Sequence, residues 1–163
     1  MDKEAEKLLI LLKDAIDIVY EKHSKIFQKK GVERSIVALI YAEMYQMLPE
    51  SDYSDLDLNL EYNKDGYDIK TAQGFPKGMC PDMILHRMDS QDNNKMVVEF
   101  KGWWNHNREN RERDLKKLAT LTKKMGKYRY SLGVSVLLGK KEAECTIIIN
   151  GEDCTKDFNN LIA

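Results

Sequence analysis

Apolar residues recur at helical spacing in the first third of the chain. Residues 3–29 carry one apolar stripe, which predicts a helix that Gly31 separates from a second helix over residues 32–48. The apolar stripe of the second helix consists of Ile36, Val37, Ile40, Met44 and Met47. Pro49 follows directly, and because proline lacks a backbone N–H donor, we expect the second helix to end there.

Strand patterns dominate the remainder of the chain. Residues 56–62 alternate between apolar and polar side chains, which predicts a strand with one buried face, and the polar residues 63–80 predict a loop. Four further apolar runs predict strands at residues 83–87, 95–101, 130–138 and 144–150. The turn-rich residues between the first two of these runs predict a hairpin.

One long helix is predicted between these strands, over residues 105–125. Its apolar side consists of Leu115, Leu118, Ala119, Thr122 and Met125. The order of elements is therefore α-α-β-β-β-α-β-β, which is typical of a mixed α/β domain with a central sheet.

The length of 163 residues suits one domain, which we expect to span residues 1–163 with residues 1–30 as an N-terminal helical extension packed on or next to the core. The apolar run Leu8–Leu12 is far shorter than the roughly 20 residues of a membrane span, and the acidic start is unlike a secretory signal. Three cysteines, an odd number without metal-like spacing, favour a reduced, cytoplasmic compartment, and we expect no membrane partner.

The net charge of -1 conceals an uneven distribution of charge. Residues 1–100 hold 13 Lys and Arg against 19 Asp and Glu, whereas residues 101–163 hold 13 against 8. Nine basic and three acidic residues lie within residues 108–129 alone. This segment is either a solvated, lysine-rich helix face or a basic patch that faces a phosphate backbone.

The most informative residues lie on the predicted hairpin. Asp82 opens its first strand, and Glu99 and Lys101 lie two apart on the second, so their side chains share one face of the sheet. Two carboxylates can hold Mg²⁺ for phosphodiester cleavage, and a lysine can orient the attacking water or stabilise the developing charge. The alternative is an ordinary hairpin with a surface ion pair.

A further carboxylate is expected from the second helix, where Glu33 and Glu43 are the candidates. At 100° per residue, Glu33 lies near the centre of the apolar arc and Glu43 at its margin. A carboxylate on a core-facing stripe needs a partner, which a metal ion or Lys101 would supply. Glu33 would also suit the first turn of a helix for electrostatic reasons alone.

Together, Pro81-Asp82, Glu99-Phe100-Lys101 and Glu33 resemble the motif of the PD-(D/E)XK nuclease superfamily, which includes restriction endonucleases and archaeal Holliday-junction resolvases. The run of elements over roughly residues 32–140 is similar to the αβββαβ core of that superfamily, and small bacterial or phage members look most alike. The resemblance implies an α/β fold with a restriction endonuclease-like core, a central mixed β-sheet flanked by helices, and an extra N-terminal helix.

The resemblance also implies an activity, that of a Mg²⁺- or Mn²⁺-dependent endonuclease or exonuclease. Asp82, Glu99 and Glu33 would be metal ligands and catalytic residues, and Lys101 would be the catalytic lysine. We expect DNA rather than RNA as the nucleic-acid partner. A homodimer is a further expectation, because superfamily members often act as dimers that cut two strands.

The residues after Lys101 are the candidates for binding nucleic acid, namely Trp103, Trp104, Arg108, Arg111 and Lys116. A tryptophan could stack on a base, or both could pack against the protein. Two other functions stay open. The chain could be a catalytically silent nucleic-acid- or protein-binding module on the same fold, or a regulator or inhibitor of another protein.

Overall fold

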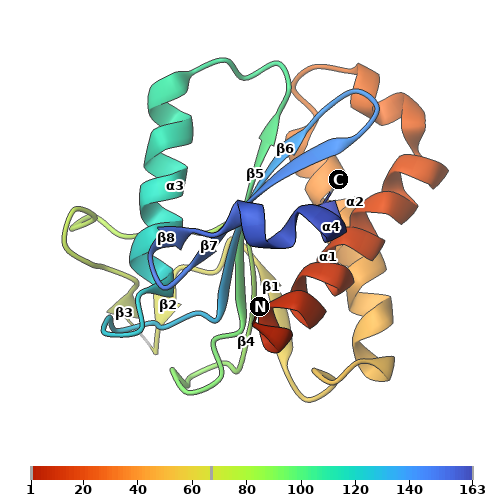
Figure 1. The fold of residues 1–163 in the computed structure, drawn as a ribbon. Coiled ribbons are helices and arrows are strands. Elements are labelled where there is room, and N and C mark those ends of the chain that lie inside the picture. Colours follow the sequence, from red (N-terminus) through yellow and green to blue (C-terminus); the bar gives the residue numbers. More distant parts are fainter. Residues whose placement is uncertain (1, 67, 163) are drawn as a thin grey trace.

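The computed structural model describes residues 2–66 and 68–162, and Figure 1 shows how their elements are arranged. A sheet of six strands forms the centre, in the order β1 (Asp57–Leu60), β4 (Met83–His86), β5 (Met96–Gly102), β6 (Leu132–Leu138), β7 (Ala143–Ile149) and β8 (Glu152–Asp153). Only β5 and β6 are parallel, and every other neighbouring pair is antiparallel. The sheet is therefore mixed, as the sequence predicts.

Helices cover both faces of this sheet (Figure 1). On one face lie α1 (Lys3–Lys22) and α2 (Glu33–Met47), and on the other lies α3 (Arg108–Thr122). The chain finishes with the short helix α4 (Asn159–Ile162), beside α1. The predicted mixed α/β fold with a central sheet flanked by helices is confirmed.

Alternation along β5 divides the apolar core into two layers. Val98 and Phe100 pack with the buried side chains of α1 and α2, whereas Val97 packs with Leu118 of α3. Because strand side chains alternate between faces, Glu99 and Lys101 share the face of Val97 and point towards α3. Because β5 and β6 are parallel, the chain must cross from the end of β5 back to the start of β6, and α3 makes this crossover.

Some predicted boundaries were wrong. The helix predicted over residues 3–29 ends at Lys22, and a 3₁₀ helix follows over Ser24–Gln28. The chain turns between them, which stacks Phe27 of the 3₁₀ helix against Tyr20 of α1. The predicted loop over residues 63–80 contains a small hairpin of β2 (Lys64–Asp65) and β3 (Asp68–Ile69).

Two side chains predicted to be buried are exposed. Met125 is 99% exposed because α3 ends three residues earlier, at Thr122. Leu60 is 37% exposed because it lies at the end of β1, an edge strand of the sheet. None of the helices in the described part of the chain is both long enough and apolar enough to cross a membrane.

The apolar face of α1 belongs to the same cluster of buried residues as the sheet, so we expect α1 to contribute to global stability. Leu9 is fully buried, and Leu9→Ala should lower the free energy of unfolding by about 2–5 kcal/mol, measured by urea denaturation. The neighbouring Ile10 is 41% exposed, so Ile10→Ala is the matched control and should change it by less than about 1 kcal/mol. Equal effects of the two substitutions would contradict this packing.

Candidate functional site

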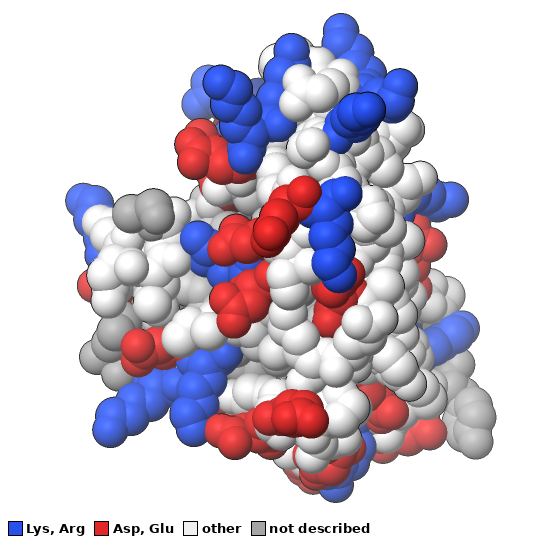
Figure 2. Space-filling model, turned by 90° about the vertical axis from the view of Figure 1, so that its right-hand side faces the viewer, with Lys and Arg blue, Asp and Glu red and all other residues white. Residues whose placement is uncertain are grey.

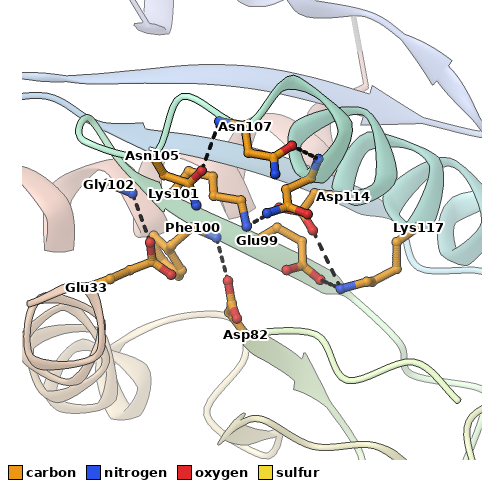
Figure 3. A network of polar contacts seen from close by, with 11 residues as sticks. Glu33, Asp82, Glu99, Phe100, Lys101, Gly102, Asn105, Asn107, Asp114 and Lys117 are labelled. Atoms are coloured by element: carbon orange, nitrogen blue, oxygen red, sulfur yellow. Dashed lines mark hydrogen bonds and ion pairs between the residues drawn. The ribbon is translucent and has the colours of Figure 1, made fainter. Parts of the chain in front are cut away.

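The second half of β5 extends beyond its antiparallel partner. β4 pairs with β5 only from Met96 to Val98, so the N–H groups of Phe100 and Gly102 lie on an edge with no strand beside it. Two carboxylates bind these N–H groups instead (Figure 3). Phe100 N donates to Asp82 Oδ2 at 2.7 Å, and Gly102 N donates to Glu33 Oε2 at 2.9 Å. The edge of β5 thereby fixes two acidic side chains from other elements.

The helix carboxylate at this edge is Glu33, the first residue of α2. Glu43, the alternative, lies near the other end of α2, where its Oε1 is 3.1 Å from Lys22 Nζ of α1. Since Gly102 directly follows Lys101, the bond from Gly102 brings Glu33 close to the hairpin residues. The position of Glu33 therefore agrees with its place at the centre of the apolar arc.

Glu99 and Lys101 point towards α3, which supplies a partner for each (Figure 3). Lys101 Nζ lies 2.9 Å from Asp114 Oδ2, and Lys117 Nζ lies 2.9 Å from Glu99 Oε1. Lys117 Nζ is also 3.8 Å from Asp114 Oδ1, so the two pairs form one network between β5 and α3. Lys101 and Lys117 are therefore both paired with carboxylates of this network.

Two carboxylate oxygens of this network are buried without a hydrogen bond within the described chain. They are Glu99 Oε1 and Asp114 Oδ2, and each has an ammonium group at ion-pair distance but not in hydrogen-bond geometry. The side chain of Glu99 is only 4% exposed. Buried carboxylate oxygens of this kind need further compensation, and a cation or a proton can supply it.

The carboxyl groups at the edge of β5 have raised pKa values. Burial is the main cause for Glu99, and the charge of Asp82 adds to it, so the pKa of Glu99 lies well above its ordinary value. Burial also raises the pKa of Asp82 and of Glu33, although the hydrogen bonds from Phe100 and Gly102 oppose the shift. Like charges close together in a buried site favour binding of a proton or a cation.

The pKa of Lys101 is raised as well. Burial alone would lower the pKa of Lys101, but the ion pair with Asp114 outweighs burial. Lys101 therefore remains an ammonium group at neutral pH, held on the same side of β5 as Glu99.

The donor chemistry of this edge suits a hard divalent cation, because carboxylate oxygens are the ligands that Mg²⁺ prefers. In the described residues, no three Asp, Glu, His or Cys side chains lie in positions to bind one ion together. Mg²⁺ is usually bound by one or two carboxylates and keeps several waters, which the neighbouring pair of Asp82 and Glu99 fits. The role of Glu33 as a third ligand stays a prediction.

A basic cleft lies beyond the end of β5, and we name it the Trp103 cleft. Its volume is about 540 Å³, and its charged lining residues are Arg108, Arg111 and Glu112, beside Trp103, Asn105, His106 and Asn107. The ammonium groups of Lys140 and Lys30 lie 4.4 and 5.8 Å from the centre of the Trp103 ring. Figure 2 shows one face of the molecule, with Lys and Arg side chains at its top and at its lower left and Asp and Glu side chains in its middle and along its bottom.

The two tryptophans are both partly buried and meet edge to face, with ring centres 5.7 Å apart. Trp103 Nε1 donates to Phe27 O at 2.7 Å. Trp104 packs against the core and over Gly102, where an added Cβ atom would lie 2.3 Å from the Trp104 ring. Packing therefore explains Trp104, whereas Trp103 also lines the basic cleft.

The remaining predicted binding residues do not form one surface. Arg108 and Arg111 are exposed in the Trp103 cleft, where Arg108 Nε lies 3.1 Å from Glu112 Oε1. Lys116 lines a different cleft, of about 450 Å³, with its ammonium group 5.9 Å from the centre of the Phe75 ring. The structure brings Arg108 and Arg111 together with Trp103, but not Lys116.

Sequence reasoning missed Asp114, Lys117, Lys30 and Lys140. A signal for Asp114 was present, because on a helical wheel it lies about 40° from the buried Leu118, on the core-facing side of α3. The same argument identified Glu33. By contrast, Lys30 and Lys140 lie far apart in the sequence, and only the folded chain places both beside Trp103.

Comparison with known proteins gives no family for this chain. No protein-family model matches the sequence, and a search of curated proteins found no relative. The resemblance to the PD-(D/E)XK superfamily is therefore a hypothesis that depends on the residues and on their arrangement.

The raised pKa of Asp82 predicts how stability depends on pH without divalent cations. The folded chain keeps the Asp82 proton to higher pH than the unfolded chain, so its contribution to the free energy of unfolding falls as pH rises from the ordinary to the raised pKa. Asp82→Asn removes this charge and retains an oxygen acceptor for Phe100 N–H. We expect a higher thermal midpoint than wild type near about pH 7.5, by ~2–4 °C for each kcal/mol gained.

Scanning calorimetry across the pH range, with a chelator present, measures this difference. The difference in thermal midpoint between Asp82→Asn and wild type should narrow as the pH falls towards about 4, where even carboxyl groups of ordinary pKa begin to take up protons. A lower midpoint for Asp82→Asn at neutral pH would mean that Asp82 stabilises the fold by its charge.

Proposed function

We propose that this protein is a metal-dependent nuclease with a restriction endonuclease-like core, and that it hydrolyses phosphodiester bonds in nucleic acid, DNA rather than RNA. One observation carries the proposal. Glu33 begins α2, Asp82 directly precedes β4, and Glu99 and Lys101 lie on β5, where backbone N–H groups of the unpaired edge bind Glu33 and Asp82. An ordinary hairpin with a surface ion pair would not bury Glu99 or require Glu33.

The order of elements supports the same proposal. From α2 to β6, the main helices and strands follow the order α2, β1, β4, β5, α3, β6, which is compatible with an αβββαβ core. β1, β4 and β5 are antiparallel neighbours, and β6 lies parallel to β5 after the crossover through α3. This arrangement is compatible with the mixed sheet that the resemblance implies.

Asp82 and Glu99 would hold the Mg²⁺ or Mn²⁺ ion, with Glu33 nearby. When bound, such an ion polarises the phosphoryl oxygen and lowers the pKa of its bound water. The hydrogen bond from Phe100 N–H fixes one oxygen of Asp82, which limits the orientations of its carboxylate. Burial of Glu99 excludes water from this side of the site and strengthens its interaction with a cation.

Lys101 would stabilise the negative charge that develops on the phosphate oxygens, or orient the attacking water. Both roles require a protonated amine, and Asp114 keeps Lys101 protonated and oriented. Asp114 thus acts through Lys101 as a positioning residue. The Trp103 cleft, which begins two residues after Lys101, would bind phosphates next to the cleaved bond.

Cleavage assays test this proposal directly. With Mg²⁺ or Mn²⁺, purified protein should cleave nucleic acid, DNA faster than RNA. Asp82→Ala and Lys101→Met should each lower the rate at least about 100-fold, since each removes a group that acts in the transition state. The exposed Asp92 offers a matched control, and Asp92→Asn should retain wild-type activity. Failure to cleave any nucleic acid with any divalent metal would refute the proposed activity.

Binding to nucleic acid should depend strongly on salt if the Trp103 cleft contacts phosphates. Arg108→Ala and Arg111→Ala, two residues that line this cleft, should each weaken binding of duplex DNA and lower the slope of log K against log salt concentration by about 0.9, because each removes one phosphate contact. Fluorescence anisotropy in Ca²⁺ measures both quantities. Lys156 is an exposed lysine outside this cleft, and Lys156→Met is the control. If the salt slope of Lys156→Met equals that of the cleft variants, the cleft is not the binding surface.

A catalytically silent binding module is the second candidate, and the ion pairs favour it. Lys117 pairs with Glu99 and Lys101 pairs with Asp114, so the chain itself supplies a counter-ion for each of these carboxylates, as a site without a metal would require. Calorimetry distinguishes the candidates. Divalent-metal binding that Glu99→Ala abolishes supports the enzyme, whereas nucleic-acid binding without metal binding supports the module.

A further inference from the structure

The contact between Lys117 and Glu99 is the least expected feature of the site. Lys117 extends from α3 until its ammonium group lies 2.9 Å from Glu99 Oε1, and both side chains are largely buried, at 14% and 4% exposure. A divalent cation that binds Glu99 through Oε1 would compete with this ammonium group for the same oxygen. The pair therefore connects metal binding to a movement of Lys117.

The contact is of a kind that can exchange. Lys117 Nζ is within ion-pair distance of Glu99 Oε1, yet that oxygen has no hydrogen bond among the described residues. The net gain from a buried ion pair is small, because the desolvation of both charges offsets their attraction. A divalent cation has twice the charge of an ammonium group, so it competes effectively for the same carboxylate.

The formal charges of the site agree with such an exchange. Glu33, Asp82, Glu99 and Asp114 are four carboxyl groups, whereas Lys101 and Lys117 are two ammonium groups. With every group ionised, the sum is -2, which one divalent cation neutralises. Displacement of Lys117 would keep this balance, because its ammonium group stays within the site.

Lys117 also has another position within reach. Asp114 Oδ1 lies 3.8 Å from Lys117 Nζ, and the flexible lysine stem allows a small rotation towards it. The helix itself need not move, because Leu118 and Leu121 hold α3 against the sheet with fully buried side chains. The exchange thus needs a change of one side chain only.

We propose that Lys117 is a displaceable counter-ion of Glu99, which a divalent cation moves towards Asp114 and the substrate phosphate. This inference rests on the proposed function, because it assigns the metal to Glu99. Before metal binds, Lys117 neutralises Glu99; after metal binds, the same ammonium group is free to contact a phosphate oxygen. Lys117 would thereby contact the substrate phosphate only after metal binding, which makes phosphate binding dependent on metal.

Titration calorimetry with Ca²⁺ tests the exchange without any need for catalysis. Lys117→Met removes the competing ammonium group at similar volume, so Ca²⁺ should bind about 10- to 100-fold more tightly, the size of effect that groups next to metal ligands have. Lys123→Met removes an exposed charge at the end of α3 and is the control, with little change expected. Thermal unfolding verifies that the variants fold. If Lys117→Met does not fold, Lys117→Gln takes its place in the titration.

Salt separates direct exchange from a long-range effect of charge. A local exchange should keep the difference in affinity between wild type and Lys117→Met at high salt, whereas the field of a distant charge is screened. The inference is overturned if Lys117→Met binds Ca²⁺ no more tightly than wild type, or if salt abolishes the difference. In that case, cleavage by the wild type would still leave the proposed function intact. Absence of both Ca²⁺ binding and cleavage in the wild type overturns both.

Discussion

The N–H groups on the unpaired half of β5 are the constraint on which the candidate site depends. A buried backbone donor without a partner is costly, and no strand continues β4 along this edge. Asp82 and Glu33 accept these bonds, so the same two interactions complete the sheet and draw acidic groups together. The acidic cluster is thus a product of how the edge of the sheet is satisfied, and its charge is the consequence.

That charge requires compensation, and the topology determines its source. Because β5 and β6 are parallel, the chain must cross one face of the sheet between them, and α3 makes this crossing over Glu99 and Lys101. Asp114 and Lys117 face the strand from that helix and pair with the opposite charges. The site therefore joins three layers of the fold, with α2 on one side of β5 and α3 on the other.

The sequence predicts much of this arrangement, and the physical reason is local periodicity. The alternation on β5 placed Glu99 and Lys101 on one face, and the apolar arc of α2 placed Glu33 nearer its centre than Glu43, both of which stayed candidates. Asp114 could have been found in the same way, whereas the pairing of Lys117 with Glu99 depends on how α3 packs on the sheet. Such packing depends on contacts between distant residues, which periodicity does not encode.

One position, Gly102, belongs to both the packed core and the acidic cluster. Its N–H group binds Glu33, and the absence of a side chain leaves room for the ring of Trp104. A substitution there would push the indole away and shift the bond that holds Glu33. In the evolution of this chain, Gly102 and Trp104 are therefore expected to change together or not at all. A substitution in this part of the core would also alter the acidic cluster.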